Sequence, residues 1–159
     1  MNPHDQTQLE QKMAEFFLAG GMPYELYGIA EQELEALYTK GFQEYNAQQY
    51  GKAIESFAYL ISLKPDEKRY LFAFAATLQA VKDYKKAIYY YSMAAYQDMD
   101  DPTITLQVIE CLIALKMYED ALAVLEVLLQ ETASDTQWSA LHTKALAYQT
   151  LLAKKALET

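Results

Sequence analysis

The stretch Tyr50-Gly51-Lys52-Ala53-Ile54 decides the fold, because closely similar stretches return twice further along the chain. The second copy is Tyr84-Lys85-Lys86-Ala87-Ile88 and the third is Tyr118-Glu119-Asp120-Ala121-Leu122, so the two steps are equal. Large apolar side chains follow each alanine by four residues, at Phe57, Tyr91 and Leu125. A fixed period of this kind indicates stacked copies of one supersecondary unit.

The period, which is about 34 residues, and the residues that keep it resemble the tetratricopeptide repeat, in which each unit is a pair of antiparallel helices. The small side chains of Ala53, Ala87 and Ala121 let the two helices of a unit approach closely. The larger residue that follows each alanine fills the space between neighbouring units. The sequence therefore predicts an all-α solenoid of three helix pairs, with an N-terminal helix and a C-terminal capping helix.

We expect the three repeats to span residues 31–65, 66–101 and 102–133. Their predicted helices cover 31–47, 50–63, 67–81, 84–97, 102–115 and 118–131. Pro65 ends the first unit because proline cannot continue a helix interior, and Pro102 begins the third because proline suits a first turn. Residues 1–30 hold a predicted helix over 5–19, which Gly20-Gly21 ends, and an apolar linker. Residues 134–159 hold the capping helix, over about 136–157, with Ser134-Asp135 as its N-cap.

Composition narrows the class of function. The 159 residues carry 13 basic and 22 acidic side chains, a formal net charge of −9, and nucleic-acid binding needs a clustered basic surface instead. No window approaches 18 uncharged apolar residues, so we expect no membrane insertion. The N-terminus lacks the basic and apolar regions of a signal peptide, and we expect a cytoplasmic protein.

No enzyme signature is visible in the sequence. His4 and His142 lie far apart, and no histidine near Cys111 would make its thiol a nucleophile, so we expect a buried small hydrophobic residue there. Asp98, Asp100 and Asp101 lack the glycine turn and closing glutamate of a calcium loop. The sequence predicts no catalytic residue, no metal and no cofactor.

The concave face of such a superhelix is lined by the first helix of each pair, through repeat positions 2, 5, 9, 12 and 13. Taking the repeated alanine as position 20 assigns these positions. The predicted groove residues are Glu35, Tyr38, Phe42, Tyr45 and Asn46, then Arg69, Phe72, Ala76, Gln79 and Ala80, and finally Thr103, Leu106, Glu110, Ile113 and Ala114.

Tyr38, Phe42 and Tyr45 are three and four residues apart and so share one helical face. That face differs from the one with Leu37 and Gly41, which turns toward the second helix of the unit. Rigid rings with a polar edge suit an extended peptide that carries spaced apolar anchors. The alternative is that the rings are ordinary core. A clamp for a C-terminal carboxylate is disfavoured, because it needs Lys, Asn and Arg where Tyr38 and Phe42 stand.

Further segments extend the likeness beyond the repeat itself. They are Phe16-Phe17-Leu18-Ala19-Gly20-Gly21 at the end of the first helix, Leu34-Glu35-Ala36-Leu37-Tyr38, and Ile109-Glu110-Cys111-Leu112 in the third repeat. In this order and spacing they resemble the class II chaperones of bacterial type III secretion, the low-calcium-response family. The resemblance covers roughly residues 9–130.

The resemblance implies a chaperone whose groove holds an extended N-terminal segment of hydrophobic translocator proteins and keeps them soluble and competent for export. It implies groove or supporting roles, by position, for Tyr38, Phe42, Tyr45, Tyr50, Leu63, Phe72 and Tyr91. It also implies a homodimer when no client is bound, with Phe16, Phe17 and Tyr59 as candidate contacts. The alternative is a general tetratricopeptide scaffold or adaptor that joins folded proteins.

Overall fold

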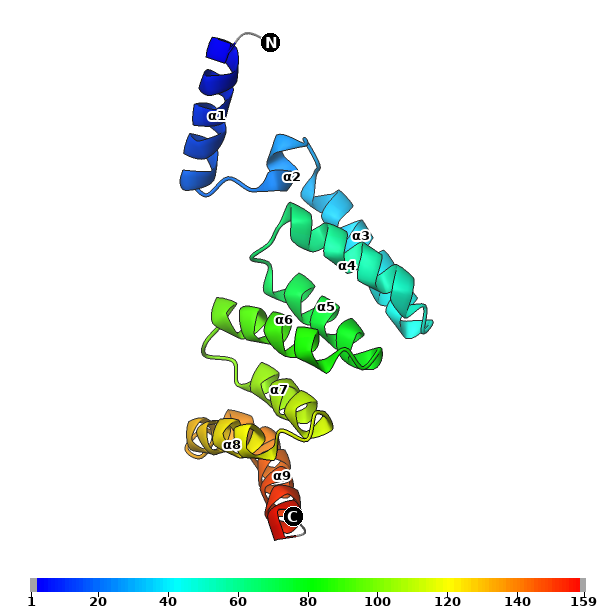
Figure 1. Cartoon of the computed structure of the whole chain (residues 1–159), viewed down its shortest axis with the longest axis vertical. Helices are drawn as coiled ribbons and strands as arrows, with labels where there is room; N and C mark the ends of the chain where they lie inside the picture. The colour runs from blue at the N-terminus through cyan, green and yellow to red at the C-terminus, as the bar shows by residue number, and fades with distance from the viewer. Residues whose placement is uncertain (1–2, 158–159) are drawn as a thin grey trace.

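The structure, a computed structural model, describes residues 3–157, with side chains described for residues 6–155. These residues form nine α-helices and one short 3₁₀ helix in an elongated stack (Figure 1). The elements are α1 (Pro3–Leu18), α2 (Pro23–Leu26), α3 (Glu31–Asn46), α4 (Tyr50–Leu63), α5 (Lys68–Ala80), α6 (Tyr84–Gln97), α7 (Thr103–Ala114), α8 (Tyr118–Thr132), η1 (Thr136–Trp138) and α9 (Ser139–Leu157).

Three helix pairs follow one another in the stack: α3 with α4 (unit one), α5 with α6 (unit two) and α7 with α8 (unit three). The second helix of each unit packs on the next helix along the chain, and α8 packs on α9. Each of these six helices has both its ends within one residue of the predicted ends. The prediction of an all-α tetratricopeptide solenoid is confirmed.

The N-terminal part differs from the sequence prediction in one element. The linker after Gly21 contains the four-residue helix α2, which was not predicted. Pro23 lies in its first turn, and the carboxylate of Glu25 accepts a hydrogen bond of 2.7 Å from the backbone N–H of Met22. Helix α1 ends as expected, because Gly20 takes φ 86° and the N–H of Gly21 donates to the carbonyl of Phe16 at 2.9 Å.

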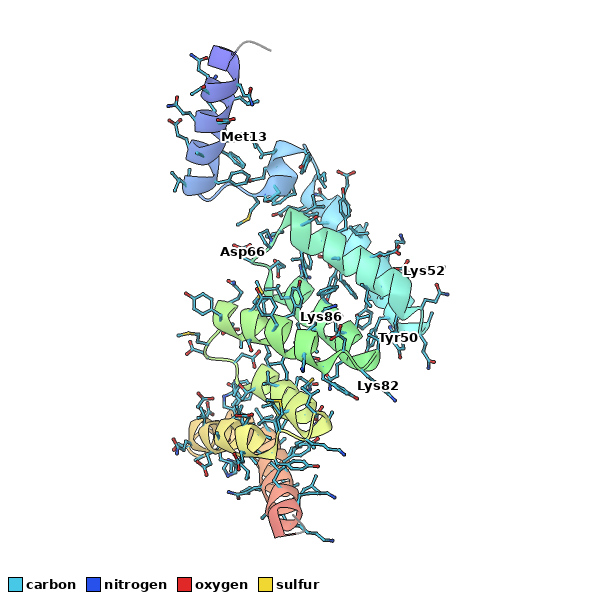
Figure 2. All side chains as sticks on the ribbon, viewed as in Figure 1. Met13, Tyr50, Lys52, Asp66, Lys82 and Lys86 are labelled. Carbon is cyan, nitrogen blue, oxygen red and sulfur yellow. The ribbon has the colours of Figure 1, made fainter. Side chains whose placement is uncertain are left out.

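The turn inside each unit has the same backbone in all three copies. Gln48, Lys82 and Lys116 have φ values of 58°, 65° and 61°, and they lie one repeat period apart. In the second copy, the N–H groups of Lys82 and Asp83 donate to carbonyls of the preceding helix at 2.9 Å, which satisfies the helix end. Figure 2 shows Tyr50 and Lys82 along one edge of the stack, where these turns lie, and Asp66, between units, along the other.

The repeated alanines lie at the centre of the packing. Ala53, Ala87 and Ala121 are fully buried, and the larger residues four positions later, Phe57, Tyr91 and Leu125, are almost as inaccessible. The burial of the alanines agrees with the close approach of the two helices expected in each unit.

The core continues from the repeats into the C-terminal helix. Units one and two share one cluster of buried side chains, while unit three shares a second cluster with Ala145 and Leu152 of α9. Asp135 caps η1, which precedes α9, by accepting a hydrogen bond of 2.9 Å from the N–H of Gln137. Helix α9 therefore covers the end of unit three.

We expect Gly41→Ala to destabilise the protein by about 1–3 kcal/mol, although alanine favours a helix over glycine by about 1 kcal/mol. A Cβ at position 41 would lie 2.8 Å from Cε1 of the buried Phe57 ring, so that packed ring would have to shift. The matched control is Gly51→Ala, where a Cβ meets nothing within 4 Å, and it should stabilise. Urea unfolding followed by circular dichroism measures both, and an unchanged midpoint for Gly41→Ala contradicts the clash.

Candidate functional site

An apolar cavity of 210 Å³ opens between units one and two. It is lined by Tyr38, Phe42 and Tyr45 of α3, Phe57 of α4, and Phe72, Ala73 and Ala76 of α5. Five of these seven are predicted groove residues, so the structure brings the two groups of predicted side chains together. Phe42 is 51% exposed and Phe72 is 37% exposed, so both rings can be reached from solvent.

The cavity walls are braced by rings behind them. The centroid of Tyr38 lies 5.6 Å from that of Tyr70 and 6.0 Å from that of Phe57. Tyr50 meets Tyr45 edge to face at 5.6 Å, which gives Tyr50 a supporting place rather than one in the lining. Aromatic contacts of this kind hold ring orientations, so the cavity is largely pre-formed.

Tyr91 braces the opposite wall from within the core. Its ring lies 5.4 Å from that of Phe72, and its hydroxyl donates a hydrogen bond of 2.7 Å to Oε1 of Gln79. Burial raises the pKa of this hydroxyl well above its usual value. Tyr91 therefore supports the wall, and Gln79 is held in place by it.

Two other predicted groove residues do not reach the surface. Leu63 and Leu106 are both buried. Leu106 belongs to the cluster that unit three forms with α9, so the repeat position that lines the cavity in units one and two is filled by core in unit three. The repeat positions alone did not reveal this, because they do not say what covers the last unit.

A charged bridge borders the cavity at the beginnings of α3 and α5. Nη2 of Arg69 lies 3.1 Å from Oε2 of Glu35, and Nε lies 3.3 Å from Oε1 of Glu67. The guanidinium carbon is 5.2 Å from the ring centroid of Tyr38, a cation–π contact. Asn46, exposed at the other end of α3, leaves a polar edge there too.

Glu110 of α7 is held by the C-terminal helix. Its Oε1 accepts hydrogen bonds from the hydroxyl of Tyr148 at 2.8 Å and from Nζ of Lys144 at 3.2 Å. Burial, together with this bond to Glu110, raises the pKa of Tyr148 to about 12. The far part of the predicted groove is therefore polar.

The candidate dimer contacts lie outside the cavity. Phe16 packs edge to face on Phe17 with centroids 5.4 Å apart, on a helix that projects from the end of the stack (Figure 1). Tyr59 is exposed on α4, beside a hollow of 350 Å³ that is also lined by Leu37 and Lys40.

Within the described part of the chain, no group of three or more His, Cys, Asp or Glu side chains could hold a metal ion. None of the helices described there is both long and apolar enough to cross a membrane.

We expect Cys111 to resist alkylation in the folded protein, because burial raises the pKa of its thiol to about 11 and the thiolate is the reactive form. Iodoacetamide at about pH 8 should label it at least ~100-fold more slowly than in concentrated guanidinium chloride. Mass spectrometry counts the label. Rapid labelling of the folded chain contradicts a buried thiol.

Comparison with known proteins gives the same architecture. Residues 78–145 match the family model described as tetratricopeptide repeat. The chain is 27% identical over 155 residues to the low calcium response locus protein H of Yersinia pestis, covering 97% of this chain and 92% of that protein.

Solved structures agree with these matches. A type III secretion system complex from Aeromonas hydrophila has a chain with a TM-score of 0.83 and 27% identity, covering 92% of this chain and 97% of its own. The Yersinia enterocolitica type III secretion chaperone SycD, in complex with a peptide of the translocator YopD, gives a TM-score of 0.72 and 25% identity over 80% of this chain and 97% of its own. The chain described here is thus similar, in sequence and in structure, to the LcrH/SycD-like tetratricopeptide repeat proteins.

Proposed function

We propose that this protein is a type III secretion chaperone of the translocator class. It binds an extended N-terminal segment of a hydrophobic translocator protein and keeps that client soluble and competent for export. The open, ring-lined cavity between α3 and α5 carries the proposal. The protein acts by binding rather than by catalysis, in the bacterial cytoplasm.

The energetics of the cavity fit this task. Burying one Leu, Val or Phe side chain contributes about 1.5–3 kcal/mol, and micromolar affinity corresponds to about 8 kcal/mol, so several apolar anchors along the client segment are needed. Braced rings lose little freedom when the client binds, which keeps the entropic cost low. The same burial removes from water the apolar side chains through which the client would otherwise self-associate.

We expect Phe42→Ala and Tyr38→Ala each to weaken client binding by about 10- to 100-fold, since each removes a cavity wall. The client is found by co-expression with candidate secreted proteins that have one or two long apolar segments, by asking which one becomes soluble. Calorimetry with its N-terminal segment gives the affinity, and circular dichroism checks that helicity is kept.

The matched control is Tyr96→Ala, which removes a ring that is 77% exposed and outside the cavity lining. Its affinity should equal that of the wild type. A general scaffold that joins folded proteins would bind with no dependence on Phe42 or Tyr38. Unchanged affinity in both cavity variants therefore rules out the chaperone role proposed here.

We also propose that the client-free protein is a homodimer assembled through α1. This 16-residue helix exposes Leu9, Met13 and Phe17 and projects from the stack (Figure 1). An apolar helix face without a cover is costly in water, and a second copy of the same face can bury it.

We expect Phe17→Glu to shift the client-free protein toward monomer by about tenfold or more in dissociation constant, because it puts a charge into an apolar contact. Sedimentation velocity at several concentrations measures the shift. Leu146→Glu is the control, since Leu146 is similarly exposed on α9 at the opposite end of the chain. Equal sedimentation of Phe17→Glu and wild type contradicts a dimer through α1.

A further inference from the structure

Beyond the cavity, the lining of the predicted groove changes from apolar to charged. One repeat position is occupied by Phe42 in unit one, by Ala76 in unit two and by Glu110 in unit three. These three residues are spaced by one repeat period. Phe42 and Ala76 line the apolar cavity. The third member is instead a carboxylate whose side chain is only 22% exposed.

Tyr91 shows that this carboxylate is close to the cavity. The Tyr91 ring contacts Phe72, in the cavity wall, with centroids 5.4 Å apart. The pKa of its hydroxyl is raised first by burial, and the carboxylate of Glu110 raises it further. Tyr91 shares one buried cluster with Cys111, the neighbour of Glu110 in the chain, and Tyr45 of the cavity lining packs against the same cluster.

Half of the Glu110 carboxylate is available to a ligand. The hydrogen bonds from Tyr148 and Lys144 both end on Oε1. Among the described residues no hydrogen bond to Oε2 is found, and no fully buried side-chain oxygen there is left without a partner, so Oε2 keeps some contact with solvent. The Lys144 side chain is 54% exposed, and an ion pair of that kind contributes little and exchanges readily.

We propose that Glu110 determines specificity by binding a Lys or Arg side chain of the client through Oε2. The inference rests on the proposed function, because it requires a client segment in the groove. Neighbouring packed helices lie about 8–10 Å apart, and an extended chain advances roughly 3.3 Å per residue. The cavity lies between α3 and α5, so Glu110 on α7 is about one and a half such spacings from its centre, and the basic residue therefore lies about three to five residues from the anchor.

A purely structural role for Glu110, in which it fastens α9 through Lys144 and Tyr148, makes different predictions. In that case loss of Lys144 weakens the packing of α9 and harms the binding of every client alike. If Glu110 instead binds a basic side chain of the client, Lys144 competes with that side chain for the same carboxylate. Loss of Lys144 then improves the binding of basic clients only.

The test uses short, capped host peptides with a central Leu anchor, carrying Lys or Gln three, four or five residues away on either side. Fluorescence anisotropy gives the affinities. In wild type we expect about a 2- to 5-fold preference for Lys over Gln at one spacing, on one side of Leu. The preference should shrink in about 0.5 M salt, as exposed charge interactions do.

Three variants separate the two roles. Glu110→Gln, which keeps a partner for Tyr148, should abolish the preference for Lys and bind the Gln peptide as wild type does. Lys144→Met should improve binding of the Lys peptide about 2- to 5-fold and leave the Gln peptide unchanged. Glu126→Gln, on the exposed face of α8, is the matched control and should keep the full preference.

The outcomes distinguish a failure of the Glu110 proposal from a failure of the chaperone proposal. No preference for Lys in wild type, or the same preference in Glu110→Gln, overturns the role of Glu110 while leaving the chaperone proposal intact. Weaker binding of both peptides by Lys144→Met assigns Glu110 to fastening α9 only. If no host peptide binds, or if Leu→Ser in the peptide has no effect, the apolar cavity is not the client site and both proposals fail.

Discussion

The close approach of two helices at a buried alanine is the constraint on which the rest of the structure depends. Ala53, Ala87 and Ala121 leave no accessible surface, so a larger side chain at any of them would push the helices of its unit apart. The large residue that follows the alanine is buried as well and packs on the first helix of its own unit, as Phe57 does on Tyr38 and Tyr91 does on Phe72. The same orientation is thereby repeated, which keeps the first helices of units one and two adjacent and leaves a ring-lined opening between them.

Most of the fold was predictable from the period of the sequence, because each unit repeats the same helix ends. The left-handed residues in the turns were not, since glycine is the usual signal for that conformation and Gln48, Lys82 and Lys116 stand there instead. Helix α2 was missed for a similar reason. Four residues are too few for a hydrophobic period, and its only marks are a proline and a glutamate that caps the backbone.

The candidate site was predictable where neighbouring repeats are alike, and less so at the end of the array. Tyr38, Phe42 and Phe72 meet because equivalent positions of units one and two face the same opening. Leu106 was misplaced because α9 completes a separate core with unit three. Helix α9 itself was predicted as a capping helix, but the repeat positions did not indicate that Leu106 would be buried in the core that α9 forms with unit three.

Contacts between residues one period apart also have a consequence for how the array can grow. Arg69 pairs with Glu35, and Lys144 pairs with Glu110, each across one full period of the sequence. A duplication of unit one or of unit two, inserted in register, would therefore set two copies of Glu35 or two copies of Arg69, which carry like charges, one period apart. The opposite charges at the present junctions therefore favour this order of units over an array lengthened by copying one of them.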